Sequence, residues 1–306
     1  PGAPTVLVYG HYDVQPADPL DQWTTPPFEP TVRDGNLYAR GATDDKGQML
    51  THINSAQAWI ETAGQLPLQL KILIEGEEEI GSPSLNSFLL DHKELLKSSV
   101  ALNPDTGMIS ADLPTLVYGL RGLSYFEVRV FGPDHDLHSG VFGGVVHNPA
   151  QVLSDLISKM HDENGKVALP HFYDDVLELT SAERAELARL DLDDEYYKGQ
   201  TGTFQLWGEK GYTAVERIGA RPTLEVNGLL SGFTGVGAKT VIPSKAMAKI
   251  STRLVPNQDP KKIHQCLIDF FEANAPDSVK YEIEMLSGGH PSNSVLNLPE
   301  TRAMIQ

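Results

Sequence analysis

The sequence is poor in cysteine and in positive charge. Cys266 is the one cysteine among 306 residues, so the chain cannot form an internal disulfide, which fits a reducing compartment such as the cytoplasm. Lysine and arginine number 24 against 41 aspartates and glutamates, a net charge of −17. No basic stripe is present to neutralise the phosphates of a nucleic acid. An anionic membrane surface would repel the negatively charged chain. No apolar run approaches the roughly 20 residues of a membrane-spanning helix. We therefore expect no nucleic-acid or membrane partner.

The patterns of several enzyme classes are also missing. HExxH and GxSxG do not occur, so neither a single-zinc protease nor a serine hydrolase is indicated. Gly235–Thr240 (GVGAKT) resembles a phosphate-binding loop, but Ala238 stands where that pattern requires a glycine directly before the lysine. The sequence has 40% hydrophobic and 21% charged residues, which is typical of a globular protein. Its length suggests two domains of roughly 150 residues each.

The first hundred residues alternate between strand and helix patterns. Short β-branched or apolar runs predict the strands, and apolar residues spaced three and four apart predict the helices. The predicted strands are Thr5–Tyr9, Leu68–Ile74 and Val100–Leu102, and the predicted helices are Asp44–Ala63 and Ser84–Leu96. This order predicts a parallel or mixed sheet with helices packed on its faces.

Polar clusters follow each of the three predicted strands. They are His11–Asp13, Glu75–Glu79 and Asp105, and Asp44–Asp45 opens the first helix. Ligands of such sheets bind beyond the carboxyl ends of the strands, so we expect these side chains to lie at one edge. Crowded carboxylates repel each other unless a cation compensates, and zinc takes histidine nitrogen and carboxylate oxygen as ligands. Two metals roughly 3.5–4 Å apart can share a carboxylate and activate a water, while a spare carboxylate takes its proton.

Each cluster by itself has a plainer interpretation. Asp44–Asp45 could cap the helix that follows, Glu77–Glu79 could be a solvated loop, and His11 could be a hydrogen-bonded loop histidine. The coincidence of all of them after successive strands favours the metal site.

The second half of the chain has the pattern strand–helix–strand–strand–helix–strand, which is the split βαβ order of a ferredoxin-like domain. The strands are expected at Gly122–Phe131, Leu224–Val226, Lys245–Leu254 and Val279–Met285, with helices opened by Asn148-Pro149 and Asp259-Pro260. Asparagine or aspartate followed by proline is a typical helix start. Leu169–Arg221 exceeds what this domain requires, and it is charged and partly helical.

Six segments, spread over nearly the whole chain, carry a family resemblance. They are Gly10–Ala17 (GHYDVQPA), Tyr38–Gln48 (YARGATDDKGQ), Glu75–Ser82 (EGEEEIGS), Pro104–Met108 (PDTGM), Asp136–Gly144 (DLHSGVFGG) and Ser251–Pro260 (STRLVPNQDP). Together they resemble the di-zinc metallopeptidase family that contains carnosinase, cytosolic non-specific dipeptidase, acetylornithine deacetylase and succinyl-diaminopimelate desuccinylase. The similarity is greatest to the dipeptidase branch.

The resemblance implies a centre of two zinc ions, although Mn²⁺ or Co²⁺ would also suit carboxylate-rich ligands. It assigns His11 and Asp105 to one zinc and Glu79 to the other. Asp44 resembles the carboxylate that bridges the two, and in the family its bond to the next residue, here Asp45, is a cis peptide.

The resemblance also implies the catalytic and substrate-binding groups. Glu78 resembles the general base for a zinc-bound hydroxide, and Asp13 the carboxylate that orients the His11 imidazole. His138 resembles a histidine that reaches across the dimer to stabilise the oxyanion of the tetrahedral intermediate. Its plainer interpretation is a loop histidine that is hydrogen-bonded to a neighbouring aspartate. Three residues resemble substrate contacts of the family. Arg253 resembles the residue that binds the terminal carboxylate of the substrate, and Thr240 and His290 resemble further contacts. For the arginine, an ordinary charge at a strand end is the alternative.

The resemblance implies an α/β fold in three parts. Residues 1–117 would form the first part of a catalytic domain, a mixed sheet flanked by helices as in zinc peptidases. Residues 118–291 would form an inserted ferredoxin-like α+β lid and dimerisation domain, and residues 292–306 the truncated start of the second catalytic part. A further zinc-ligating histidine of the family has no counterpart here, and the chain starts at Pro1 without methionine, so we expect the sequence to be part of a longer protein.

The expected function is hydrolysis of the amide bond of dipeptides or short peptides by a cytoplasmic homodimer that forms through the lid. One alternative is an N-acyl-amino-acid deacylase of the same family, although the long lid and the HYDVQP segment favour the dipeptidase. The other is a catalytically inactive binding or dimerisation module on the same fold, against which the retained Glu78, Asp44 and Glu79 argue.

Overall fold

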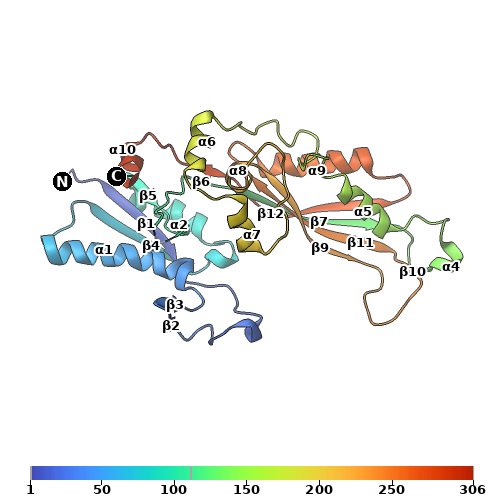
Figure 1. Cartoon of the computed structure of the whole chain (residues 1–306), viewed down its shortest axis with the longest axis horizontal. Coiled ribbons are helices and arrows are strands. Elements are labelled where there is room, and N and C mark those ends of the chain that lie inside the picture. The colour runs from blue at the N-terminus through green and yellow to red at the C-terminus, as the bar shows by residue number, and fades with distance from the viewer. Residues whose placement is uncertain (1, 111, 306) are drawn as a thin grey trace. The chain divides into compact units, whose positions relative to one another are not determined.

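Residues 2–110 and 112–305 are described by the computed structural model, and the chain divides into two units. The first unit comprises the chain up to Val117 together with the segment from Asn297 onward, and the second comprises Tyr118–Leu296. Figure 1 shows both units and labels their larger elements. Among the helices of the described residues, none combines the length and the apolar character needed to cross a lipid bilayer.

The first unit is built on a three-stranded parallel sheet in the order β4-β1-β5. Its strands are β1 (Thr5–His11), β4 (Gln69–Glu75) and β5 (Val100–Leu102), with a separate hairpin of β2 (Thr31–Arg33) and β3 (Asn36–Tyr38). Its helices are η1 (Leu20–Gln22), η2 (Ala42–Lys46), α1 (Gly47–Ala63), η3 (Glu78–Ile80), α2 (Leu85–Asp91), α3 (Lys93–Leu96) and α10 (Pro299–Ile305). Because the three strands of the sheet are parallel, their carboxyl ends meet at one edge, which agrees with the predicted α/β architecture.

Some local features of this unit differ from the predictions. Ser84–Leu96 forms two helices instead of one, because His92 leaves the helical conformation (φ −113°, ψ 17°). The β2–β3 hairpin was not predicted from the periodicity, although Asp34 and Gly35 at its turn both have the positive φ angles (49° and 79°) typical of such a pair. Strand β1 also continues to His11, so this histidine ends the strand instead of following it.

The second unit contains a four-stranded antiparallel sheet in the order β12-β7-β11-β9. Its strands are β7 (Gly122–Phe131), β9 (Thr223–Ser231), β11 (Lys245–Leu254) and β12 (Lys280–Gly289), with crossover helices α5 (Pro149–Ser158) and α9 (Pro260–Asn274). This order confirms the ferredoxin-like prediction, although β9 and β12 extend beyond the predicted ends. Both predicted helix starts are confirmed, since the side chain of Asn148 accepts from the N–H of Ala150 at 2.9 Å and that of Asp259 from the N–H of Lys261 at 2.7 Å.

One face of this sheet carries the core of the second unit. Alternate residues of β7 and β11 are buried, among them Phe126, Val128 and Ile250. They pack against the apolar faces of α5 and α9, where Leu153 and Leu267 are wholly buried. The other face carries charged side chains that pair with one another, among them Glu127, Arg129, Lys249 and Glu284.

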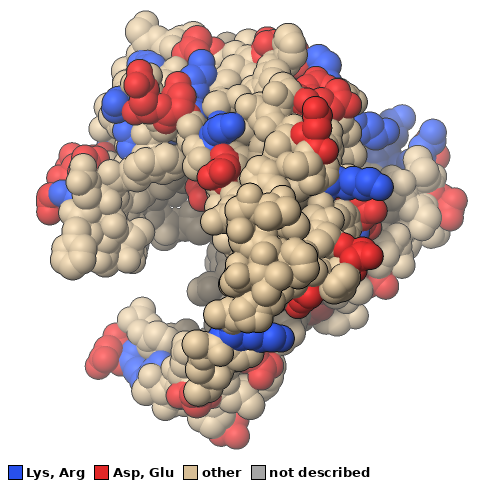
Figure 2. Space-filling view, turned by 90° about the vertical axis from the view of Figure 1, so that its right-hand side faces the viewer, with Lys and Arg blue, Asp and Glu red and all other residues tan. Residues whose placement is uncertain are grey.

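The remaining elements of the second unit lie in the insertion and beyond the ends of the sheet. They are β6 (Gly119–Leu120) paired with β13 (Ser292–Asn293), β8 (Leu137–His138) paired with β10 (Val241–Ile242), α4 (Ser139–Phe142), α6 (Ser181–Ala188), α7 (Asp194–Thr201) and α8 (Ala214–Ala220). Within the insertion, the buried Arg221 donates two hydrogen bonds of 2.8 Å to Glu209 and lies over the ring of Tyr212. On the face that Figure 2 shows, acidic and basic side chains are interspersed without a continuous basic stripe.

We predict that Leu267→Ala lowers the free energy of unfolding by about 2–5 kcal/mol, because it removes a wholly buried side chain and leaves a cavity between α9 and the sheet. Leu177→Ala is the matched control, since the same change at a side chain that is 64% exposed should alter stability by less than about 0.5 kcal/mol. Denaturant unfolding followed by circular dichroism measures both. Equal losses of stability in the two variants would contradict the assignment of the core.

Candidate metal centre

His11, Asp44 and Asp105 lie together beyond the carboxyl ends of the parallel strands. His11 ends β1, Asp105 follows β5, and Asp44 lies in η2 directly before α1. One ligand atom from each residue lies within 4.8 Å of the other two. The Nε2 atom of His11 is 3.0 Å from Oδ1 of Asp44 and 3.8 Å from Oδ2 of Asp105. These distances lie on either side of the roughly 3.3 Å expected between ligand atoms of a tetrahedral zinc ion, so the cluster fits a divalent cation.

The segment that carries Asp44 has an irregular backbone. Within η2, Asp44 is non-helical (φ −150°, ψ 90°), and its bond to Asp45 is cis, as the resemblance implied. Neither aspartate caps α1, because the N-cap residue of this helix is Lys46 and no side chain caps it. Asp44 instead contacts the ring of His11, and Asp45 accepts a hydrogen bond from the backbone N–H of His11. The interpretation of this pair as a helix cap is therefore wrong.

Asp13 links the imidazole of His11 to the loop after β4. Nδ1 of His11 lies 3.1 Å from the backbone oxygen of Asp13 and 3.3 Å from its Oδ1. The same carboxylate accepts from the N–H groups of Glu78 and Glu79 at 3.3 and 3.0 Å. Burial raises the pKa of Asp13, but these backbone hydrogen bonds outweigh burial and hold the pKa below its usual range. Asp13 thus stays ionised and fixes the turn that carries both glutamates.

Glu78 faces the cluster from this turn. Its Oε2 atom lies 4.0 Å from Nε2 of His11. Burial raises the pKa of the Glu78 carboxyl, and the charges of neighbouring carboxylates, Asp105 foremost, raise it further against the opposing effect of His11. A carboxyl group with a raised pKa beside a candidate cation site is suited to accept a proton.

Two further residues, Gln15 and Asp45, contact these groups although the sequence assigned neither of them a role in the site. Gln15 donates to the carboxylate of Glu79 from its backbone N–H at 3.2 Å and from its side-chain amide at 2.7 Å. Asp45 is wholly buried and accepts from the backbone of His11. Gln15 belongs to the GHYDVQPA segment, so the sequence motif could have pointed to it as a site residue. The burial of Asp45 depends on tertiary packing and has no such signal in the sequence.

Negative charge is concentrated in the cluster. Burial raises the pKa of Asp105, and the charges of Asp44 and Asp45 raise it further. Burial lowers the pKa of His11, but its hydrogen bond to Asp44 and the charge of Asp105 more than offset this and raise it overall. Both shifts reflect crowded carboxylates that favour a positive partner, which a bound divalent cation would supply.

The other predicted site residues lie in the second unit. Nδ1 of His138 accepts from the N–H of Gly140 at 2.9 Å, so the neutral ring carries its proton on Nε2, 3.2 Å from Oγ1 of Thr240. This pair lies beyond the end of β7, where β8 meets β10.

Arg253 and His290 lie at the opposite end of the same sheet. Arg253 of β11 and Gly289 of β12 both pair with Leu123, near the start of β7. Both candidate side chains are exposed, and Nδ1 of His290 is 4.0 Å from Oδ2 of Asp259. The fold of the second unit thus pairs His138 with Thr240 but does not bring Arg253 and His290 to them.

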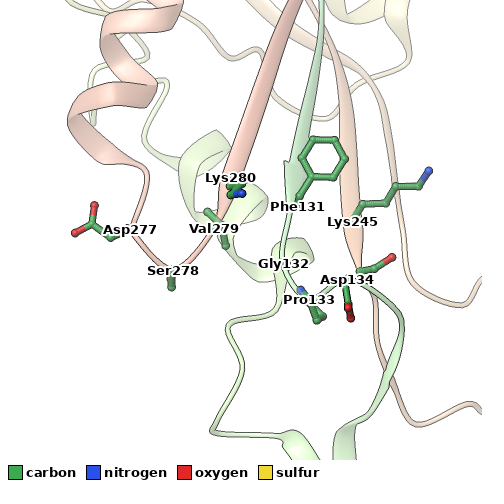
Figure 3. A pocket seen from close by; sticks show the side chains of 10 residues that line it. Phe131, Gly132, Pro133, Asp134, Lys245, Asp277, Ser278, Val279 and Lys280 are labelled. Carbon is green, nitrogen blue, oxygen red and sulfur yellow. The ribbon is translucent and has the colours of Figure 1, made fainter.

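A hollow of about 510 Å³ lies where β7 ends and β11 and β12 begin. Its lining includes Phe131, Asp134, Lys245, Asp277 and Lys280. Figure 3 shows Lys245 and Asp277 extending to opposite sides, so the charged groups do not converge on one point. The cluster around His11, where ligand atoms do converge, is therefore the better candidate for chemistry than this hollow.

Known sequences are similar to this chain over most of its length. Residues 7–305 match the peptidase family described as M20/M25/M40. The chain is 36% identical over 304 residues to Beta-Ala-His dipeptidase of Homo sapiens, which covers 97% of the chain and 59% of that protein. It is 39% identical over 269 residues to Cys-Gly metallodipeptidase dug1 of Schizosaccharomyces pombe, which covers 87% of the chain and 56% of that protein. The chain thus spans less than two thirds of the length of these curated relatives.

Solved structures share the architecture of both units. The M20 family metallo-carboxypeptidase Sso-CP2 from Sulfolobus solfataricus matches with a TM-score of 0.83 and 34% identity, over 99% of this chain and 68% of that one. Human carnosine dipeptidase 1 matches with a TM-score of 0.78 and 34% identity, over 99% and 65% of the two chains.

We predict that Zn²⁺ binds the metal-free protein and that Asp105→Asn, which keeps the shape of the side chain but removes a charged ligand, weakens binding at least about tenfold. Asp277→Asn is the matched control, because this exposed aspartate of the second unit lies outside the cluster. Isothermal titration calorimetry measures the affinities. Unchanged zinc binding by Asp105→Asn would contradict the assignment of the cluster as a metal centre.

Proposed function

The chain belongs to the peptidase family M20/M25/M40, and we propose that it acts as a metal-dependent dipeptidase that hydrolyses the amide bond of dipeptides or short peptides. The observation that carries the proposal is the convergence of His11, Asp44 and Asp105 at the carboxyl edge of the parallel sheet, with Glu78 facing them. The relatives that are named as dipeptidases support the class of substrate.

We propose a centre of two zinc ions, of which the cluster of His11, Asp44 and Asp105 supports the first and the family resemblance the second. His11, Asp44 and Asp105 would hold one cation, and Asp44 and Glu79 would supply oxygen ligands to the second. Bound divalent cations supply Lewis acidity and lower the pKa of a water molecule. Mn²⁺ or Co²⁺ would suit the same residues, because carboxylate and imidazole ligands accept several first-row metals.

Glu78 is the proposed general base. Its carboxylate lies 4.0 Å from His11, and burial together with surrounding negative charge raises its pKa. It would take a proton from the attacking water and return it to the leaving amine. Asp13 is unsuited to this step, since its carboxylate is held by backbone N–H groups and its pKa is lowered. Its proposed role is to orient the imidazole of His11.

The second unit would supply the groups that bind substrate. His138 can donate from Nε2 to the oxyanion of a tetrahedral intermediate, because its Nδ1 is already occupied by the N–H of Gly140. Thr240 lies beside that donor. The guanidinium of Arg253 can bind the terminal carboxylate of a peptide through two hydrogen bonds, and His290 lies at the same end of the sheet.

We propose that the protein is a homodimer formed through the second unit. His138 and Thr240 lie beyond one end of the sheet and Arg253 lies at the other, so a second copy is needed to gather them around one substrate. Apolar side chains beside His138 are exposed, including Val141 at 66% and Val145 at 81%, as expected of a surface that a partner covers. A cytoplasmic location is supported by the single, unpaired cysteine.

We predict that the zinc-loaded protein cleaves dipeptides at least about tenfold faster, in kcat/KM, than N-acetyl amino acids with the same C-terminal residue. The free amino group of a dipeptide is a cation that the acidic edge of the site attracts, and acetylation removes that charge. Steady-state kinetics on a matched panel, with tripeptides included, measures the preference.

Glu78→Gln is the control for this panel. It should lower kcat about 10²- to 10⁴-fold while zinc still binds, because it removes only the proton acceptor. Preference for N-acyl substrates would indicate the deacylase instead. A metal-replete protein that cleaves no small amide would indicate an inactive binding module.

We also predict that His138→Ala and Glu78→Gln each abolish most activity, and that an equimolar mixture regains roughly a quarter of the wild-type rate. Random mixing gives about half heterodimers, and each has one site that combines an intact Glu78 with an intact His138 from the other copy. Peptidase assays measure the rate, and native mass spectrometry verifies that heterodimers form. Heterodimers without recovered activity would show that His138 does not act across the dimer.

A further inference from the structure

The central strand of the first unit loses a neighbour on one side before it ends. β4 pairs with the whole of β1, up to His11 opposite Glu75, but β5 pairs only with Val6–Val8. The N–H of Tyr12 donates to the backbone oxygen of Glu75 on the β4 side, so the N–H of His11, one residue earlier, points to the open side. A buried strand N–H without a partner is costly, so another group has to accept it.

Asp45 supplies the acceptor. Its Oδ2 atom lies 3.3 Å from the backbone nitrogen of His11, and both residues are wholly buried. The other oxygen of this carboxylate, Oδ1, is buried without a hydrogen-bond partner in the part of the chain that the structure describes. Burying a carboxylate with half of its acceptors unused is unfavourable, and proteins tolerate such a cost chiefly where a site requires it.

Gly10 leaves the space that this carboxylate occupies. A Cβ atom on residue 10 would lie 2.9 Å from Oδ2 of Asp45 and 3.2 Å from Cγ of Met49 on α1. The carboxylate therefore lies directly against the backbone of β1, between the strand and the helix. Any side chain at this position would push the carboxylate away from His11.

Two consecutive residues thus hold the same histidine at two places. Asp44 lies 3.0 Å from the ring nitrogen Nε2 of His11, and Asp45 holds the backbone of His11. We propose that Asp45 is a positioning residue of the metal centre, whose carboxylate fixes the end of β1 and thereby the imidazole relative to the two ligand carboxylates. This inference rests on the metal site of the proposed function and not on hydrolysis.

Cobalt binding to the metal-free protein tests the proposal, since the visible spectrum of bound Co²⁺ reports the arrangement of its ligands. Asp45→Asn retains an oxygen that can accept from His11, whereas Asp45→Ala removes it. We expect the asparagine variant to keep the wild-type spectrum. We expect the alanine variant to change the spectrum and to lose about 10- to 100-fold in affinity, as is typical when a partner of a metal ligand is removed.

Two further variants guard against a general effect on folding. Glu216→Gln alters a buried carboxylate of the second unit, and it should leave both the spectrum and the affinity unchanged. Gly10→Ala keeps Asp45 but fills the space beside its carboxylate, so it should change the spectrum as Asp45→Ala does. If Asp45→Ala does not fold, the spectrum of Gly10→Ala tests the proposal in its place.

Wild-type spectra and affinities in both Asp45→Ala and Gly10→Ala would overturn the proposal. So would an equal disturbance in the asparagine and alanine variants, because the hydrogen bond would then not be the cause. No substrate enters these measurements, so a protein without peptidase activity would leave the result as informative as before.

Discussion

Negative charge gathered at the carboxyl edge of a small parallel sheet is the constraint on which the first unit depends. Parallel pairing forces the ends of β1, β4 and β5 to one edge, and each end delivers acidic groups there. Burial and mutual repulsion raise the pKa of Glu78 and of Asp105, so the arrangement favours a cation. The imidazole of His11 among these carboxylates supplies the nitrogen ligand that zinc prefers.

The contacts of His11 come from the turn after β1, from η2 and from the segment after β5. Its ring lies between Asp13 and Asp44, its backbone donates to Asp45, and Asp105 lies 3.8 Å from Nε2. The site is therefore a tertiary property of the sheet and of η2, and no single motif would form it in isolation. The second unit is stabilised separately by its own core, which leaves its exposed loops and strand ends free to carry the proposed substrate-binding groups.

The architecture was largely predictable because its burial pattern is regular. Alternating burial along β7 and the apolar face of α9 appear in the sequence as periods of two and of three to four residues. The break at His92 and the turn at Asp34 are local choices of backbone conformation that hydrophobic periodicity does not record. The contacts of Asp45 could not be predicted, because they depend on the short length of β5 and on the space beside Gly10, which exist only once the sheet has formed.

Anomalous X-ray scattering at the zinc absorption edge tests the central claim most directly. In crystals of the protein grown with Zn²⁺, we expect an anomalous peak about 2.0–2.2 Å from Nε2 of His11 and from carboxylate oxygens of Asp44 and Asp105. Zinc peaks at exposed histidines only, with none at the end of β1, would contradict the account.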